Sequence, residues 1–168
     1  MATEWVPFLG LILTAISIAL FLAAALHDVA ARTVPNGLAL ALAITGIAAR
    51  GLDQNLLMGL LAGVLVFVLA AICWRRGWMG GGDVKLLGAG AIAVPPGDVL
   101  TFITVMAIAG SLLAMIYLIG RAMPAPHPTN RPASLLARAL RIERRRLHRG
   151  GPLPYACAIA VGGLFVLI

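Results

Sequence analysis

The 168-residue chain is too apolar for a water-soluble protein, because 61% of its residues are hydrophobic and only 11% are charged. Soluble domains are about half apolar and about a quarter charged, and a disordered or acidic tail protein is excluded by the same composition. The formal net charge is +7, and Cys73 and Cys157 form neither a CxxC pair nor a disulfide framework. The sequence therefore predicts a membrane protein.

Six apolar stretches follow one another along the chain, and we interpret all six as transmembrane helices. The second and fourth are short enough to be re-entrant segments instead, and the last is just short of the ideal length. The predicted spans are about 5–26, 37–49, 56–74, 84–95, 99–119 and 153–168. No basic segment precedes the first span, so we expect no cleaved signal peptide. The predicted fold is an all-α polytopic membrane protein with a single membrane-embedded domain over residues 1–168.

The basic residues support six crossings, because nearly all of them then fall on one side of the membrane. The connections 27–36, 75–83 and 120–152, together with Lys85, hold twelve of the thirteen Lys and Arg residues. Only Arg50 lies on the other side, beside Asp53. Since positive charge in short loops marks the cytoplasmic side, we expect both termini to be extracytoplasmic.

The longest connection, 120–152, contains a proline-rich stretch followed by an arginine-rich segment over 131–149. Within it, residues 133–148 have the pattern of a basic amphipathic helix, which typically lies on anionic lipid headgroups. Such an arginine run can also indicate nucleic-acid binding. Because no aromatic residues accompany the arginines here, we expect anionic lipids and no nucleic acid as the partner.

Two of the six acidic residues, Asp28 and Asp83, call for a functional explanation, because acids beside membrane spans are costly. Each follows a long span and precedes a short one, so both are expected in loops at the cytoplasmic boundary. The other four are explained by solvated turns or by neighbouring arginines: Glu4, Asp53, Asp98 and Glu143.

Two carboxyl groups brought together can hydrolyse a peptide bond without a metal or a covalent intermediate. Like charges at close range share one proton, so that one carboxylate activates water while the other carboxylic acid polarises the scissile carbonyl. A nucleophile paired with histidine fits less well, since only His27 lies near a helix end. The chain has no HExxH or paired-cysteine spacing for zinc, and we expect no metal and no cofactor.

The residues around Asp83 admit two interpretations. Three glycines, 80–82, precede it, and their lack of Cβ atoms would let an extended substrate backbone approach closely. A plain flexible turn between two spans explains the same glycines.

The residues after Asp28 are also open to more than one interpretation. Arg32 could orient or neutralise Asp28, or its side chain could extend to the lipid headgroups. Pro35 and Asn36 form a favourable turn before the next helix, with Asn36 as its expected N-cap.

The two motifs together resemble those of the type IV prepilin peptidases, which are GxGD-type intramembrane aspartyl proteases. They read Asp-x-x-x-Arg-x-x-Pro-Asn from Asp28 and Gly-x-Gly-Asp-x-Lys from Gly80, and the six-span size is similar to the branch that serves Flp-type, tight-adherence pili. The resemblance implies that Asp28 and Asp83 are catalytic and that Gly80 and Gly82 shape the second loop. It assigns supporting positions to Arg32, Pro35, Asn36 and Lys85.

The resemblance also implies a substrate, a compartment and partners. The substrates would be prepilin helices in the bilayer, cleaved after the glycine that ends a short basic leader, at the cytoplasmic face of a bacterial inner membrane. Pilus-assembly machinery is a further implied partner. The likeness extends to residues 154–158, where Ala156 stands in place of a frequent glycine. Longer relatives also N-methylate the new terminus, but this chain lacks their cysteine-containing segment, so methyltransferase activity is not implied.

Other functions fit parts of the pattern. A proton- or ion-coupled transport subunit could use two membrane acids as a relay, although a relay favours acids in the middle of spans. A non-catalytic scaffold of a secretion machine would carry both acids merely as interfacial residues. A preflagellin peptidase or another GxGD protease would differ mainly in its substrate.

Overall fold

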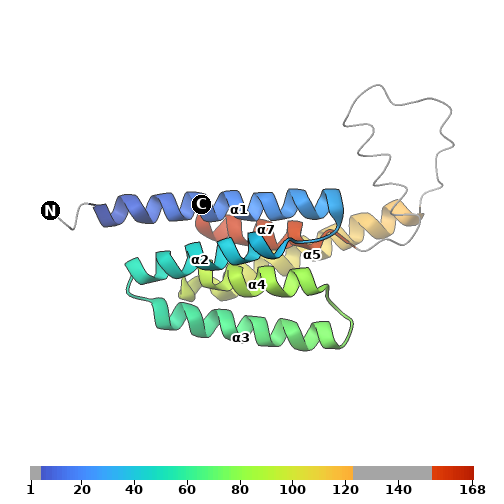
Figure 1. Cartoon of the computed structure of the whole chain (residues 1–168). Coiled ribbons are helices and arrows are strands. Elements are labelled where there is room, and N and C mark those ends of the chain that lie inside the picture. Colours follow the sequence, from blue (N-terminus) through green and yellow to red (C-terminus); the bar gives the residue numbers. More distant parts are fainter. Residues whose placement is uncertain (1–4, 123–152) are drawn as a thin grey trace, which may run out of the picture. The chain divides into compact units, whose positions relative to one another are not determined.

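The structure, a computed structural model, describes residues 5–122 and 153–168, and in these residues all regular secondary structure is helical (Figure 1). The elements are α1 (Trp5–Ala31), α2 (Asn36–Leu52), α3 (Leu56–Arg75), α4 (Gly81–Ala93), the 3₁₀ turn η1 (Pro96–Asp98), α5 (Val99–Ala122) and α7 (Tyr155–Leu167). The amphipathic helix expected over 133–148 lies outside the described residues.

Three helices are long and apolar enough to cross a membrane: Trp5–Ala31, Leu56–Arg75 and Pro96–Ala122. The helices α2 and α7 are shorter apolar helices, and α4 is shorter still. Together they confirm the predicted fold class, an all-α polytopic membrane protein.

The chain divides into two compact units, Met1–Gly110 with Pro154–Ile168, and Ser111–Leu153. The first unit contains α1 to α4, the first half of α5 and α7. Of the second unit, the structure describes the remainder of α5 and Leu153.

The short helix α4 forms the core of the first unit, where eight of its thirteen residues are buried. It contacts α2, α3 and α7, and small residues allow these close approaches. A methyl group on Gly90 would come within 3.0 Å of Phe102 and 3.1 Å of Phe21, whose rings pair at 6.2 Å between centroids. Small residues at helix contacts are the usual basis of packing between membrane helices.

The ends of α4 differ from the expected span of 84–95. The helix begins at Gly81 and ends at Ala93, with Val94 in an extended conformation (ψ 153°). Pro95 explains the early end, because the residue before a proline is forced out of the helical region. At the other end, Gly81 and Gly82 are helical, so Asp83 lies in the first turn of a helix and not in a loop.

Three helices end on a residue with left-handed backbone geometry: Arg32 (φ 58°), Gln54 (φ 57°) and Gly77 (φ 75°). After α1, the Arg32 N–H bonds to the carbonyl of Asp28 (2.7 Å), which is the simple αL form of helix termination. The helix therefore continues five residues beyond the predicted span, and Asp28 occupies its last turn and not a loop. A glycine signals this geometry only at Gly77, so sequence reasoning misses the first two ends.

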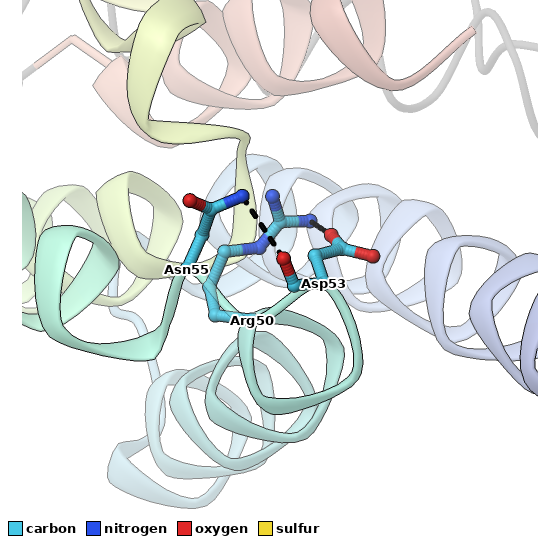
Figure 2. A network of polar contacts seen from close by, with 3 residues as sticks. All are labelled: Arg50, Asp53 and Asn55. Atoms are coloured by element: carbon cyan, nitrogen blue, oxygen red, sulfur yellow. Dashed lines mark hydrogen bonds and ion pairs between the residues drawn. The ribbon is translucent and has the colours of Figure 1, made fainter.

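The turn between α2 and α3 is held by an ion pair, shown in Figure 2. Arg50 is only 6% exposed, and its guanidinium lies 3.1 Å from the carboxylate of Asp53. The Asn55 side chain donates to the Asp53 carbonyl (3.1 Å). The stem of Arg50 packs over Gly59, where a Cβ atom would lie 2.7 Å from the arginine Cγ.

Candidate functional site

The carboxyl group of Asp28 is buried at the end of α1, with 6% of the residue exposed. Its Oδ2 atom accepts a hydrogen bond from the backbone N–H of Ala156 (3.1 Å), a contact that is itself buried. Ala156 lies in the first turn of α7, where backbone N–H groups have no partner within the helix. The N-terminus of α7 therefore supplies a donor and a favourable dipole to the Asp28 carboxylate.

Asp83 lies at the third position of α4, after the N-cap residue Gly80. Its carboxylate accepts a hydrogen bond from the Gly80 N–H, as an acidic residue does in one half of a capping box. A Cβ atom on Gly80 would lie 3.0 Å from the Asp83 Oδ2 atom. The glycine thus leaves room for the carboxyl group, and the motif forms an ordered helix start.

The structure brings the two aspartates together although 54 residues separate them in the sequence. Asp83 precedes the apolar part of α4, and its pKa is raised from 3.8 to about 6. Burial is the larger cause, and the neighbouring charge of Asp28 is the second. Two like charges within electrostatic range do not ionise independently, so the pair holds a proton at a higher pH than ordinary aspartates do.

Two further contacts tie the connection after α1 to the start of α4. Lys85 Nζ donates to Asn36 Oδ1 at 2.8 Å, and a Cβ atom on Gly82 would lie 3.2 Å from Val34 Cβ. The role expected for Asn36 is wrong, since α2 has Pro35 as its N-cap and makes no side-chain cap bond. The Asn36 amide is instead used to link the two motifs.

The remaining predicted residue, Arg32, interacts electrostatically with Asp28, as does His27. The His27 Nδ1 atom donates to the carbonyl of Thr33 (2.7 Å), which fixes the connection around Arg32. The left-handed backbone of Arg32 and this histidine bond hold the segment between α1 and α2 close to Asp28, one member of the dyad Asp28–Asp83.

The sequence resemblance extended to residues 154–158 but assigned them no role at the site, so the contribution of α7 was missed. Besides Ala156, Tyr155 lies within electrostatic range of Asp83, and its phenol Oη would be 2.7 Å from a Cβ atom on Gly110. A backbone donor has no side-chain signature, so the Ala156 contact could not have been identified from residue type. Pro154 followed by a tyrosine at a helix start was the available signal.

A metal site requires several ligating side chains in one place. Within residues 5–122 and 153–168, no three His, Cys, Asp or Glu side chains gather into a group that could hold a metal ion. The chemistry that this arrangement offers is that of two coupled carboxyl groups, each bonded to a backbone N–H.

Comparison with known proteins identifies the family. The model of the type IV leader peptidase family matches residues 15–119, which is more than half of the chain and includes both motifs. No curated protein and no solved structure matches significantly. The chain therefore belongs to the type IV leader peptidase family, and this membership makes it a membrane peptidase.

Proposed function

We propose that this protein is an aspartic endopeptidase that removes the short basic leader of Flp-like type IV prepilins, cleaving after the leader glycine. The single observation that carries the proposal is the electrostatic coupling of Asp28 and Asp83. These are the two carboxyl groups of the resembling motifs, and they come from opposite ends of different helices. Family membership supports the peptidase activity itself.

In the proposed mechanism, the pair begins with one shared proton. The ionised carboxylate takes a proton from water as the water oxygen attacks the carbonyl carbon of the scissile bond, and the protonated carboxyl group donates its proton to the carbonyl oxygen. The tetrahedral intermediate then collapses: the newly protonated carboxyl group gives its proton to the leaving nitrogen, the C–N bond breaks, and the hydroxyl proton of the intermediate returns to the other carboxylate. The two carboxyl groups end the cycle with one proton between them, so no cofactor is consumed.

The surroundings of Asp83 favour access by an extended peptide. Gly80 is exposed and Gly81 and Gly82 are half-buried, so no side chain of these three residues screens the Asp83 carboxyl group. Across the dyad, Asp28 is buried and held by Ala156. One buried and one half-buried carboxyl group suit a reaction in which the substrate approaches from one side.

We also propose where the enzyme lies in the cell and which partners it contacts. Positive charge in the connections supports a cytoplasmic location of the dyad in a bacterial inner membrane, with both termini extracytoplasmic. Anionic lipids at the connection 120–152 and pilus-assembly machinery are the proposed partners. Both acids lie in terminal turns of helices, whereas an ion-coupled transporter would favour acids within spans.

The decisive experiment is co-expression of the full chain with a candidate Flp-type prepilin. Wild-type protein should reduce the substrate mass by that of the leader, whereas Asp28→Asn and Asp83→Asn should each lower the cleavage rate at least about 100-fold. Asp98→Asn, at the exposed turn η1, is the matched control and should cleave normally. Full cleavage by either dyad variant, at equal membrane levels, would contradict the two-carboxyl mechanism.

A further inference from the structure

The helices α2, α3 and α4 enclose an open groove of about 390 Å³. Residues of all three helices line it. The apolar lining consists of Ala39, Leu40, Ala43, Gly63, Val64, Phe67, Gly88, Ala89 and Ile92. At the rims, Leu40 and Val64 are 63% and 60% exposed, so the groove opens on the outer surface of the helices.

One end of the groove is polar and positively charged. Asn36 and Lys85 line it, and their side chains are hydrogen-bonded to each other at 2.8 Å. Lys85 is exposed, and its ammonium group has three N–H donors, of which one serves Asn36. A cation at the head of an apolar groove is complementary to an amphiphile that carries an anionic head.

A flexible chain of methylene groups suits the shape of the groove. The lining is apolar along α4 from Lys85 to Ile92, a rise of about 10 Å, and it is polar at one end only.

We propose that this groove binds one anionic phospholipid, with its phosphate at Lys85 and part of an acyl chain between α2 and α3. The proposal goes beyond the peptidase function, because it concerns a second ligand on a different face of α4. A basic prepilin leader would be repelled by Lys85, whereas a phosphate is attracted to it. Since Lys85 follows Asp83 by two residues, a bound lipid would also hold the first turn of α4 in place.

The test is native mass spectrometry of the full chain, purified in detergent and supplied with dioleoyl-phosphatidylglycerol or dioleoyl-phosphatidylcholine. Wild-type protein should retain one phosphatidylglycerol about tenfold more strongly than phosphatidylcholine, as expected for one charge-assisted hydrogen bond. Lys85→Gln should lower this preference, and any preference that remains belongs to the basic connection 120–152. Ala43→Phe, which fills the groove, should abolish retention of phosphatidylcholine and lower that of phosphatidylglycerol to the level of Lys85→Gln.

The matched control is Ala48→Phe, which adds the same ring at an exposed position of α2 outside the groove and should retain lipid like wild type. Equal retention of both lipids by wild type, or full retention by Ala43→Phe, overturns the proposal. A photoreactive residue at position 40 that cross-links to prepilin and not to lipid in membranes also overturns it. The readout needs no cleavage, so it can be repeated with Asp83→Asn, and failure of the peptidase proposal would leave it unaffected.

Discussion

The charged side chains near the two ends of α2 are arranged in opposite ways. Two acids lie within electrostatic range of each other at one end, and an arginine is paired with an acid at the other. At the end that begins with Asn36, the connection from α1 brings the acid Asp28 within range of a second acid, Asp83. At the other end, the buried Arg50 is paired with Asp53 at 3.1 Å (Figure 2). Both ends also contain a residue other than glycine with a left-handed backbone, Arg32 and Gln54.

The difference separates the end of α2 beside Arg50, where the charges stabilise the fold, from the end beside Asp28 and Asp83, where they form the candidate site. An opposite charge next to a buried ion offsets part of its desolvation, so the Arg50 pair holds the turn between α2 and α3. A like charge adds to the cost of desolvation, so the aspartate pair destabilises the fold. The same pair can hold a proton near neutral pH, which is a property of function and not of stability. Perturbed carboxyl groups of this kind are typical of functional sites.

The largest effect on stability should come from breaking the ion pair between Arg50 and Asp53. Asp53→Asn leaves the buried Arg50 guanidinium without its counter-charge, and we expect a loss of about 1–3 kcal/mol because Asp53 itself is half-exposed. Thermal unfolding of the purified protein in detergent measures this change. Unchanged stability would mean that Arg50 is held by packing over Gly59 alone.

Neutralising Asp83, near the other end of α2, should have the opposite effect and raise the stability of the fold. The raised pKa of Asp83 means that the folded state is favoured when this group is protonated, so the contribution of Asp83 to stability falls as the pH rises from about 4 to about 6 and is constant above. Asp83→Asn avoids that loss. It should therefore be more stable than wild type above pH 6 and equal to it below pH 4.

The gain expected from Asp83→Asn is about 1 kcal/mol. The full shift corresponds to about 3 kcal/mol, but solvent screens a partly exposed carboxyl group and reduces the effect. Unfolding curves at pH 4 and pH 7.5 give the comparison. If Asp83→Asn were less stable than wild type at pH 7.5, this would contradict the inference that the aspartate pair destabilises the fold.

The coupling between the two aspartates can be measured directly. In Asp28→Asn the second cause of the Asp83 shift is removed while burial remains, so the pKa of Asp83 should fall below about 6 and stay above 3.8. Carboxyl carbon chemical shifts of aspartate-labelled protein report this titration. Asp98→Asn should leave the value unchanged, and the same pKa in the Asp28 variant would show that the two groups are independent.

The smallest effects should come from the two left-handed residues. Gln54→Gly removes the cost of a left-handed side-chain residue, which is about 1 kcal/mol, and part of this gain is lost to the flexibility of glycine in the unfolded chain. Arg32→Gly should give a similar change in unfolding temperature. Of the two variants, only Arg32→Gly should also slow prepilin cleavage, because Arg32 interacts with Asp28 and Gln54 is at the other end of α2. Equal cleavage by both variants would make Arg32 purely structural.

Several features of the site followed from residue types and spacing. Hydrophobic stretches predicted the helices, and the motifs at Asp28 and Gly80 pointed to the two acids that the structure places within electrostatic range. The helix ends did not follow, because Arg32 ends α1 in a conformation that glycine normally signals. The partner of Asn36 did not follow either, since Lys85 reaches it only through the packing of α4 beside α2.

By itself, the sequence determined that this chain is a membrane protein of apolar helices, with its charged residues at the ends of the spans and in the connections between them. Composition and hydrophobic length decide that much, because they depend on each segment separately. Only the tertiary structure decided that Ala156 donates to Asp28 and that Asp83 lies within reach of its charge. Such contacts join residues more than fifty positions apart, and their geometry depends on how helices with glycine at their contacts pack together.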